Sequence, residues 1–456
     1  MAPNPNRDVV FPAVAAGADG AVLALLYQLE QTQWWTAERL RDAQLAQLRS
    51  LLRHACSHVP WYRERMDACG FDALADFGWE DFTRLPVLTR TELQQHGGAL
   101  ESRRQIPEHG AISRGSSSGS TGTPVHFLST GVTYRMWKAI TLRDHLWHRR
   151  DFAGKLAVIR GEAFEGTLAN WGQATADVAG TGATPMLNIK RPMAHQIDWL
   201  LDQDPMYLLT YPTNLEAMLR HCRDRGIRPS GVREVRTVAE SVSPHQRDLC
   251  VEVWGVPLTD MYSAREAGYI ALQCPGGTHY HVQSENVVVE IVRDNGLHCL
   301  PGEEGRVLLT VLNNFALPLV RYDVGDIAVP GAPCACGRGL PVIERIAGRV
   351  RNLMTLPDGS RRWPSLVAAF YDAIDPFTQF QVVQTSLNTL ELHVVARRPP
   401  SKEETDSIKR KLNDCLRTDF AIELMLHDAI PRGPGGKYEE FVSKIDPGAG
   451  STRRRP

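Results

Sequence analysis

The order of apolar runs and helical segments between residues 127 and 255 limits the fold of this chain more than any other feature. Apolar runs of strand length, such as residues 157–159 and 207–209, alternate there with segments of helical periodicity. Thr213 and Glu216 have the spacing of a capping box, which marks one helix start. Alternating strands and helices are typical of βα units. We therefore predict an α/β fold whose large domain contains βα units.

The regions on either side have different patterns. Residues 21–66 carry leucines at roughly helical spacing among charged residues, which predicts a helical start within residues 1–100. Strand-like runs separated by Asn-Gly and Pro-Gly turns fill residues 287–329 and predict a β-rich subdomain. We expect these regions and the βα units to form one large N-terminal domain, residues 1–348.

After Arg349 the pattern restarts on a smaller scale. Alternating strands around residues 381–395 and a charged helix over residues 401–417 indicate a separate α+β domain, residues 349–445. The tail, residues 446–456, has no apolar residue beyond Ala449, so we expect it to be disordered.

The overall charge is nearly neutral, with 51 Lys and Arg against 52 Asp and Glu. Such a balance argues against nucleic acid and against an anionic membrane surface as partners. The first long apolar stretch, Val9 to Leu26, is interrupted by Pro12 and Gly17, so we expect neither a signal peptide nor a membrane span there. Nine cysteines without dense spacing favour a reducing, cytoplasmic setting. A homodimer is left open.

The strongest local signal is the segment from Gly115 to Pro124, in which every residue but the proline is Gly, Ser or Thr. Such a loop exposes backbone N–H groups and hydroxyls that can surround a polyphosphate. It lacks the Gly-Lys-Ser/Thr ending of a P-loop NTPase. A flexible linker is the alternative, but Pro124 and the βα setting argue against it. The loop is therefore a candidate phosphate-binding site.

Five further segments follow this loop. They are Ala239-Glu240-Ser241, Tyr262-Ser263-Ala264-Arg265-Glu266, residues 322–326, Gly348-Arg349, and Pro431-Arg432 followed by Gly436-Lys437. In this order, the loop and the five segments together resemble the adenylate-forming superfamily of acyl-CoA synthetases, adenylation domains and luciferases. At the N-terminus, Trp34-Trp35, residues 51–55 and residues 58–63 resemble the phenylacetate-CoA ligase branch.

This resemblance implies an enzyme that binds ATP and Mg²⁺ and forms an acyl-AMP. The implied roles are phosphate contacts from the loop, Mg²⁺ coordination by Glu266, a purine contact from Tyr262, and a carboxylate for both ribose hydroxyls from Asp326. Lys437 is expected to reach the site from a mobile C-terminal lid, and Arg351 to mark the hinge. The full set of expected nucleotide-binding residues is Ser118, Gly119, Ser120, Thr121, Gly122, Thr123, Ala239, Glu240, Ser241, Tyr262, Ser263, Asp326 and Arg349.

The implied reaction joins a small acid, expected to be aromatic, to AMP and then transfers the acyl group to CoA. Transfer to a carrier-protein thiol or to an amine or other nitrogen nucleophile is the closest alternative, and the activated acid could be another oxyanion. A non-catalytic nucleotide-binding homologue is the alternative of another class.

Several positions depart from the superfamily pattern. The loop ends with Thr123 where a lysine is common, which removes one cation. Ser263 replaces a glycine, and Arg265 stands where a small hydroxyl residue is common. The hinge carries Arg351 where Asp or Lys is usual. Taken singly, Asp326 could be a turn residue, Glu266 a helix-start charge and Lys437 a surface lysine.

A second constellation consists of Cys274, His281, Cys334 and Cys336. Three thiols and one imidazole suit a structural Zn²⁺ ion, and members of the branch have similar elements. Unrelated buried cysteines are the alternative, and His279 competes with His281. A nucleic-acid-binding zinc ribbon fits poorly, because no basic and aromatic stripe accompanies the site.

The sequence gives the weakest indication for the residues that form the acid-binding pocket. Trp137, Trp171 and Tyr211 are aromatic candidates for lining a flat substrate. Ordinary core packing is the alternative for each of them.

Overall fold

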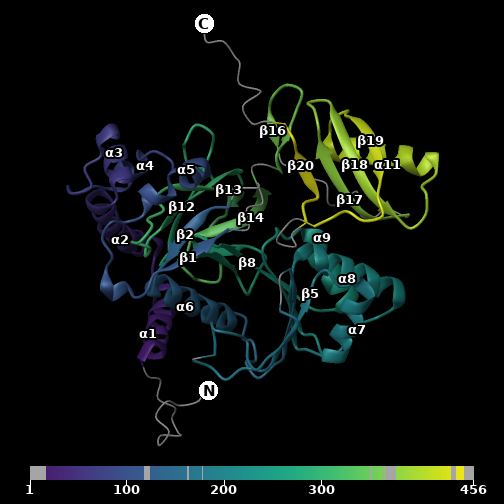
Figure 1. Cartoon of the computed structure of the whole chain (residues 1–456), viewed down its shortest axis with the longest axis horizontal. Coiled ribbons are helices and arrows are strands. Elements are labelled where there is room, and N and C mark those ends of the chain that lie inside the picture. The colour runs from purple at the N-terminus through teal and green to yellow at the C-terminus, as the bar shows by residue number, and fades with distance from the viewer. Residues whose placement is uncertain are drawn as a thin grey trace, which may run out of the picture.

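Figure 1 shows a computed structural model of the chain. The structure describes residues 17–117, 124–161, 164–176, 178–349, 352–362, 364, 376–432 and 438–445. The predicted tail therefore lies outside the described residues. No helix among the described residues is both long enough and apolar enough to cross a membrane.

The helical start predicted from the leucine spacing is present. Five helices lead the described chain: α1 (Gly17–Thr32), α2 (Ala37–His58), α3 (Pro60–Cys69), α4 (Trp79–Thr83) and α5 (Arg90–Leu100). The Thr36 hydroxyl caps α2 by accepting a hydrogen bond from the N–H of Arg39. Leu40, Leu48, Leu51 and Leu52 form the buried face of α2.

A 12-stranded sheet forms the centre of the molecule, and its strands run in the order β11-β12-β13-β14-β10-β9-β8-β7-β6-β3-β5-β4. Neighbouring strands are parallel from β5 through β3, β6 and β7 to β8, and antiparallel from β8 through β9, β10, β14, β13 and β12 to β11. The parallel part contains the predicted βα units and the antiparallel part the β-rich subdomain, so the predicted α/β class is confirmed. The strands are β3 (Leu156–Arg160), β4 (Gly166–Leu168), β5 (Thr184–Asn188), β6 (Tyr207–Thr210), β7 (Glu234–Thr237), β8 (Leu258–Ala264), β9 (Gly268–Gln273), β10 (Tyr280–Val282), β11 (Val287–Val292), β12 (Gly305–Val311), β13 (Tyr322–Pro330) and β14 (Val342–Arg349).

Helices α7 (Met193–Gln203), α8 (Pro212–Arg225) and α9 (Pro244–Trp254) connect the parallel strands, and they pack on them through a core that includes Leu208, Met218 and Leu249. α6 (Gly131–Trp147) packs against α1 and β9 instead. Ahead of α6, the short strands β1 (Ser113–Ser116) and β2 (His126–Ser129) form an antiparallel pair, and the 3₁₀ turn η1 (Pro107–His109) precedes them.

The capping box predicted at Thr213 is wrong. α8 begins two residues earlier than this cap would place it, with Pro212 at its first position, and Tyr211 at the cap makes no side-chain capping bond. The Thr213 hydroxyl donates to Glu240 instead, and Glu216 bonds to Arg220 and Gln246. The hydrogen bond from Thr213 to Glu240, a residue distant in the sequence, thus takes the place of the expected capping box with Glu216.

The C-terminal unit has a sheet and a core of its own. Its four strands run in the order β19-β18-β17-β20 and are covered by α11. The side chains of Val382, Leu392 and Leu412 meet in a cluster that contains no residue of the preceding domain. The elements are β15 (Met354–Thr355), β16 (Arg361–Arg362), β17 (Phe377–Gln384), β18 (Thr389–Ala396), α11 (Lys402–Leu416), β19 (Ala421–Leu426) and β20 (Phe441–Ser443).

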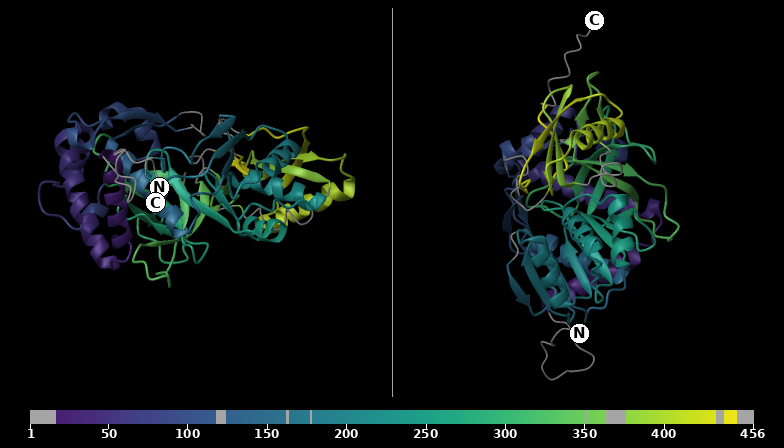
Figure 2. Two further views of the ribbon diagram at one scale, coloured as in Figure 1. Left: turned by 90° about the horizontal axis from the view of Figure 1, so that it is seen from below. Right: turned by 90° about the vertical axis from the view of Figure 1, so that its right-hand side faces the viewer.

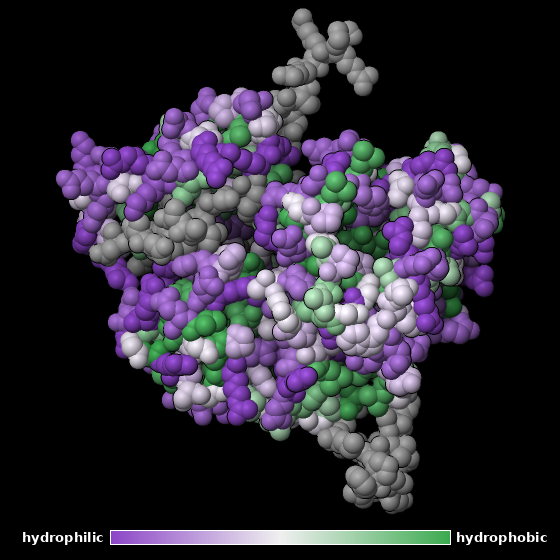
Figure 3. Space-filling view, turned by 180° about the vertical axis from the view of Figure 1, so that it is seen from behind, coloured by the Kyte–Doolittle hydropathy of each residue, from purple (hydrophilic) through white to green (hydrophobic). Residues whose placement is uncertain are grey.

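Figure 2 shows the N-terminal helices and the C-terminal unit at opposite ends of the molecule, with the large sheet between them. On the face seen in Figure 3, apolar groups are interspersed among hydrophilic ones. Strands β8, β13 and β14, which carry Tyr262, Asp326 and Arg349, lie in the middle of the molecule, between the N-terminal helices and the C-terminal unit (Figure 1).

Candidate nucleotide site and metal centre

Three residues predicted from separate motifs form one hydrogen-bonded group. The Tyr262 hydroxyl on β8 donates to Asp326 Oδ2 on β13 at 2.7 Å, and Arg349 Nε on β14 lies 2.8 Å from Asp326 Oδ1. Asp326 and Arg349 are direct partners in the β13–β14 ladder. β8 and β13 are separated by three strands, so the sheet must curve to bring Tyr262 and Asp326 together. The convergence supports a shared site.

The electrostatics of this group fix its charge state. Tyr262 and Asp326 are both buried. Burial, and then the neighbouring Asp326 carboxylate, raise the pKa of Tyr262 well above its ordinary value, which keeps the phenol protonated as a donor. Asp326 in turn raises the pKa of Arg349. A carboxylate has about four acceptor positions, so Asp326 can hold both protein donors and still accept ligand hydroxyls.

Glu266 follows β8 at the turn into β9 and is buried. Its Oε1 accepts a hydrogen bond from the Tyr322 hydroxyl at 3.2 Å and lies 3.9 Å from Arg90 Nη1. A single carboxylate of this kind is what Mg²⁺ uses when substrate phosphates supply its other ligands. Glu266 could therefore hold Mg²⁺ together with a nucleotide.

Arg90 is a residue that the sequence analysis missed. It opens α5, and its Nη2 donates to the Ser117 hydroxyl at 3.2 Å while its Nη1 faces Glu266. Thr89 and Glu92 form a capping box that marks the start of α5 in the sequence. That signal locates the helix, but nothing in it points to contact with residues far along the chain.

The glycine- and serine-rich loop itself, Ser118 to Thr123, lies outside the described residues, as do Arg351 and Lys437. The ends of the loop are described. The Ser117 N–H donates to the Val125 carbonyl at 2.8 Å, and the Val125 N–H donates to the Ser117 hydroxyl at 2.9 Å. These bonds extend the β1–β2 pair up to the loop.

The segment Ala239 to Ser241 follows β7, and its backbone is unusual. Ala239 has a φ of 75°, which L-residues other than Asn and Asp rarely adopt. Glu240 Oε2 accepts from the N–H of Thr213 at 3.1 Å and from its hydroxyl at 2.8 Å. Burial raises the pKa of the Glu240 carboxyl. Ser241, like Ser263 on β8, is exposed.

Glu240 also contacts the C-terminal unit. Its Oε1 accepts from the N–H of Tyr438 at 2.8 Å, and Arg432 Nη1 donates to the Thr213 hydroxyl at 2.9 Å. Tyr438 is the next residue after Lys437. Tyr438, beside Lys437 in the sequence, is therefore bonded to a segment that is predicted to bind the nucleotide.

Four potential metal ligands lie in one group beside β9 and β10. The ligand atoms of Cys274, His279, His281 and Cys334 all lie within 4.8 Å of one another. Cys336 adjoins them, with its Sγ 3.3 Å from His281 Nε2. Burial lowers the pKa of His281 to about 4, so its imidazole is neutral, as a metal ligand must be. The donor set suits Zn²⁺, and both histidines that the sequence left as alternatives are present.

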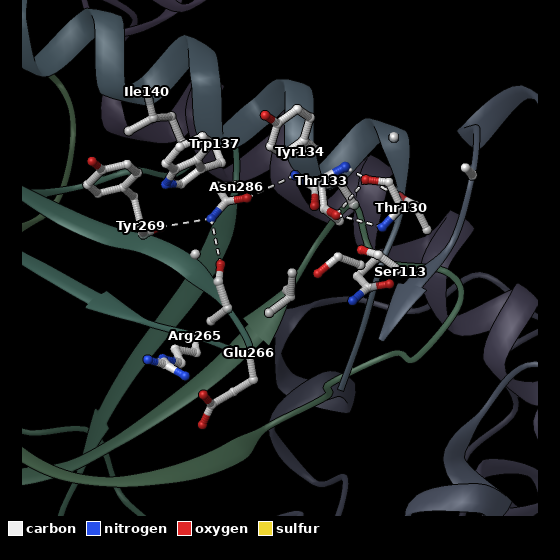
Figure 4. Close-up of a pocket in the computed structure, with 18 residues that line it drawn as sticks. Ser113, Thr130, Thr133, Tyr134, Trp137, Ile140, Arg265, Glu266, Tyr269 and Asn286 are labelled. Carbon is white, nitrogen blue, oxygen red and sulfur yellow. Dashed lines mark hydrogen bonds between the residues drawn. The ribbon is translucent and has the colours of Figure 1, made fainter. Parts of the chain in front are cut away.

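The three aromatic candidates do not share one cavity. A cavity of about 400 Å³ is lined by Trp137, together with Glu266 and Arg265, and Trp137 stacks on Tyr134 (Figure 4). Trp171 contacts Phe152 and Tyr207, and Tyr211 caps α8. Many of the groups lining the cavity are polar, and they include Ser113, Thr130, Thr133, Asn286, Asn313 and Asn314.

Comparison with known proteins gives relatives along nearly the whole chain, although no family model matches it. The phenylacetate-coenzyme A ligase of Thermus thermophilus is 25% identical over 452 residues, covering 92% of this chain and 99% of the relative. The enzyme of the same name from Pseudomonas putida is 24% identical over 421 residues, covering 88% and 92%.

Solved structures show the same fold. The crystal structure of 2-hydroxyisobutyryl-CoA ligase in the postadenylation state, in complex with 2-HIB-AMP, has a TM-score of 0.72 at 19% identity, covering 91% of this chain and 92% of that one. The anthranilate CoA ligase AuaEII in complex with anthranoyl-AMP has a TM-score of 0.53 at 16% identity, covering 72% and 66%.

The fold and the grouping of the candidate site residues resemble those of adenylate-forming enzymes. Within that superfamily the similarity is to the phenylacetate-CoA ligase-like branch, as the N-terminal motifs predicted. Both levels of the resemblance predicted from the sequence are confirmed.

Proposed function

We propose that this chain is an AMP-forming acid–thiol ligase. A small carboxylic acid attacks the α-phosphate of ATP, acyl-AMP forms and pyrophosphate leaves. The thiol of CoA then displaces AMP to give the thioester. The observation that carries the proposal is the hydrogen-bonded group of Tyr262, Asp326 and Arg349, in which Tyr262 and Asp326 are buried, together with the buried Glu266. These residues supply a planar ring, a ribose acceptor, a cation and a Mg²⁺ ligand.

Each residue has a defined task in this proposal. Asp326, held by Tyr262 and Arg349, accepts the ribose hydroxyls and so fixes the nucleotide for in-line attack. Mg²⁺ held by Glu266 would balance the charge of the phosphates. Ala239 to Ser241, constrained through Glu240, lie along the base. Lys437 stabilises the charge that develops at the α-phosphate.

We infer that the C-terminal unit lies in the orientation that belongs to the adenylation half of the reaction rather than to thioester formation. The TM-score is 0.72 to 2-hydroxyisobutyryl-CoA ligase in the postadenylation state and 0.59 to the same enzyme in the thioesterification state. Coverage of this chain is 91% in both cases. We infer that the difference in TM-score comes from a different arrangement of the two units. We propose that the unit after Gly348 rotates between the half-reactions as a lid.

The acceptor and the acid are the finer parts of the proposal. CoA is favoured because the relatives named above are CoA ligases. A flat aromatic acid is favoured by Trp137 and by the name phenylacetate-coenzyme A ligase of the curated relatives. We expect pyrophosphate release to require one acid from a panel of aryl acids, aliphatic acids and inorganic oxyanions, and thioester to form only with CoA present.

This expectation is tested by measuring pyrophosphate for each acid with and without CoA, with hydroxylamine as a trap for acyl-AMP. If the acyl group is transferred to an amine but not to CoA, the acceptor is an amine rather than CoA. If no acid of the panel causes pyrophosphate release in protein that binds ATP, the alternative of a non-catalytic nucleotide-binding homologue is favoured.

We also propose one structural Zn²⁺ ion at Cys274, His281, Cys334 and Cys336, with His279 as the competing ligand. A closed set of Cys and His ligands leaves no position for substrate, so the ion serves the fold. Protein purified without metal affinity is expected to contain about one zinc per chain. The double variant Cys334→Ser with Cys336→Ser should lose it, whereas Cys69→Ser, which changes an exposed cysteine elsewhere, should keep it.

Elemental analysis checks the zinc content, and thermal unfolding checks its effect on the fold. His279→Ala and His281→Ala, compared side by side, identify the histidine that binds. Full zinc content in the double cysteine variant would contradict the assignment.

A further inference from the structure

Arg265 is bound to the base of the glycine- and serine-rich loop. Its Nη1 donates to the carbonyl oxygen of Ser116 at 3.1 Å, across 149 residues of sequence. Ser116 is the last residue of β1, and the bonds between Ser117 and Val125 close the stem just beyond it. The guanidinium of Arg265 therefore lies where the chain enters the loop.

The charge of Arg265 is not balanced by the part of the protein that the structure describes. No carboxylate of the described residues lies within salt-bridge distance of it, and the side chain is exposed. The neighbouring Glu266 is occupied elsewhere, by Tyr322 and Arg90. Figure 4 shows the side chains of Arg265 and Glu266 close together, away from Trp137 and Tyr134. An unbalanced cation thus stands beside the proposed Mg²⁺ ligand.

An arginine on the β1–β2 stem itself has a different setting. Arg114 on β1 is also exposed, but Glu101 binds it through two hydrogen bonds, at 2.6 and 3.0 Å. That pair is neutral as a whole. The contrast shows that Arg265 is not simply one of several solvated arginines in this region.

The proposed reaction needs a cation in this region. Pyrophosphate is a highly charged leaving group, and its departure is favoured by fixed positive charge and by N–H donors. The loop carries Thr123 where the superfamily commonly has lysine. Arginine binds phosphate oxygens through two parallel N–H donors and stays charged at any relevant pH.

We propose that Arg265 supplies the cation that the loop lacks and contacts the β- and γ-phosphates of ATP and the leaving pyrophosphate. The bond to Ser116 holds the guanidinium at the loop. The inference rests on the proposed function, since it assigns a role within the same nucleotide site. Both Arg265 and Thr123 depart from the superfamily pattern. In this proposal, the cation of Arg265 takes over the role of the lysine that Thr123 replaces.

Binding of two nucleotides tests this without knowledge of the acid. AMP has the same base, ribose and α-phosphate as ATP but lacks the two outer phosphates. In Arg265→Ala, the dissociation constant for α,β-methylene-ATP with Mg²⁺ is expected to rise about 10- to 100-fold, the range for a lost hydrogen bond to a charged group. The dissociation constant for AMP should stay unchanged. Arg114→Ala, a matched control on the β1–β2 stem, should alter neither dissociation constant.

A conservative variant completes the experiment. Arg265→Lys keeps the positive charge at the described position and should retain most of the affinity for α,β-methylene-ATP. Equal weakening of AMP and of the ATP analogue would show a structural role and overturn the inference, as would unchanged affinity in Arg265→Ala. Wild-type protein that binds neither nucleotide would contradict the proposed function itself, and the inference with it.

Discussion

Lys437→Ala is expected to lower the rate of adenylation by about 10²-fold or more and to leave thioester formation from preformed acyl-AMP intact. One lysine that neutralises charge as the α-phosphate is attacked stabilises the transition state of that step alone. The second step requires the lid to turn away, so the lysine contributes nothing to it. The bond from the Tyr438 N–H to Glu240 supports the first part, because it ties the chain beside Lys437 to the site.

Both half-reactions would be measured under single-turnover conditions, with the acid found in the panel and with synthetic acyl-AMP. Lys444→Ala is a suitable control, because Lys444 belongs to the same unit and its side chain is 62% exposed. Equal impairment of both steps in Lys437→Ala would mean a structural role for the lysine. Normal adenylation would show that the motif near Gly436 was wrongly matched.

Asp326→Asn is expected to weaken the binding of ATP and of AMP alike, by about 10- to 100-fold, because both share the ribose and because bonds to a charged acceptor are the strong ones. Asparagine keeps an acceptor for the buried Tyr262 hydroxyl, and Arg349, with 35% of its side chain exposed, can be hydrated. The fold should therefore be retained. Asp326→Ala removes both acceptors and should weaken binding at least as much.

Calorimetric titration with each nucleotide measures this effect, and circular dichroism verifies folding. The matched control is Asp323→Asn, three residues earlier on β13, whose carboxylate bonds to Arg306 and to the N–H of Gly325 rather than to the site. An unchanged dissociation constant in folded Asp326→Asn would remove Asp326 from the site. Because Arg265→Ala is expected to affect only ATP, the two variants give distinct patterns.

The three residues of the main candidate group could be selected from the sequence because each lies in a motif of its own. The sequence predicts that Tyr262, Asp326 and Arg349 all bind the nucleotide, and the structure brings these three side chains together. Their mutual bonds could not be predicted, because they depend on how a sheet of 12 strands curves. The fold class followed from periodicity in a similar way, since the βα alternation is local.

Other parts could not be found from local patterns. Arg90 belongs to no motif, and its contacts with Ser117 and Glu266 arise only through tertiary packing. Thr213 has the spacing of a cap residue, but the carboxylate of Glu240 accepts its hydrogen bonds instead. Among the aromatic candidates, Trp137 lines the described cavity, whereas Trp171 and Tyr211 lie elsewhere, because aromatic residues serve core packing and ligand contact equally well.

The way in which Arg321 joins the two ends of the large domain affects how the protein can be made. Its guanidinium donates to the carbonyl oxygens of Thr83 and Leu85, and Thr83 lies 238 residues earlier in the chain. Beside it, Leu88 bridges to Tyr322 at the start of the strand that carries Asp326. At the usual synthesis rate of about 5–20 residues per second, the N-terminal helices wait roughly ten to fifty seconds for these partners.

During that interval the apolar faces of α2 and α5 lack the strands that later cover them. Exposed apolar surface on a nascent chain favours aggregation, and contacts between distant segments form late. Expression at low temperature or with added chaperones should therefore raise the yield of folded protein more than it would for a chain whose domains close in sequence order.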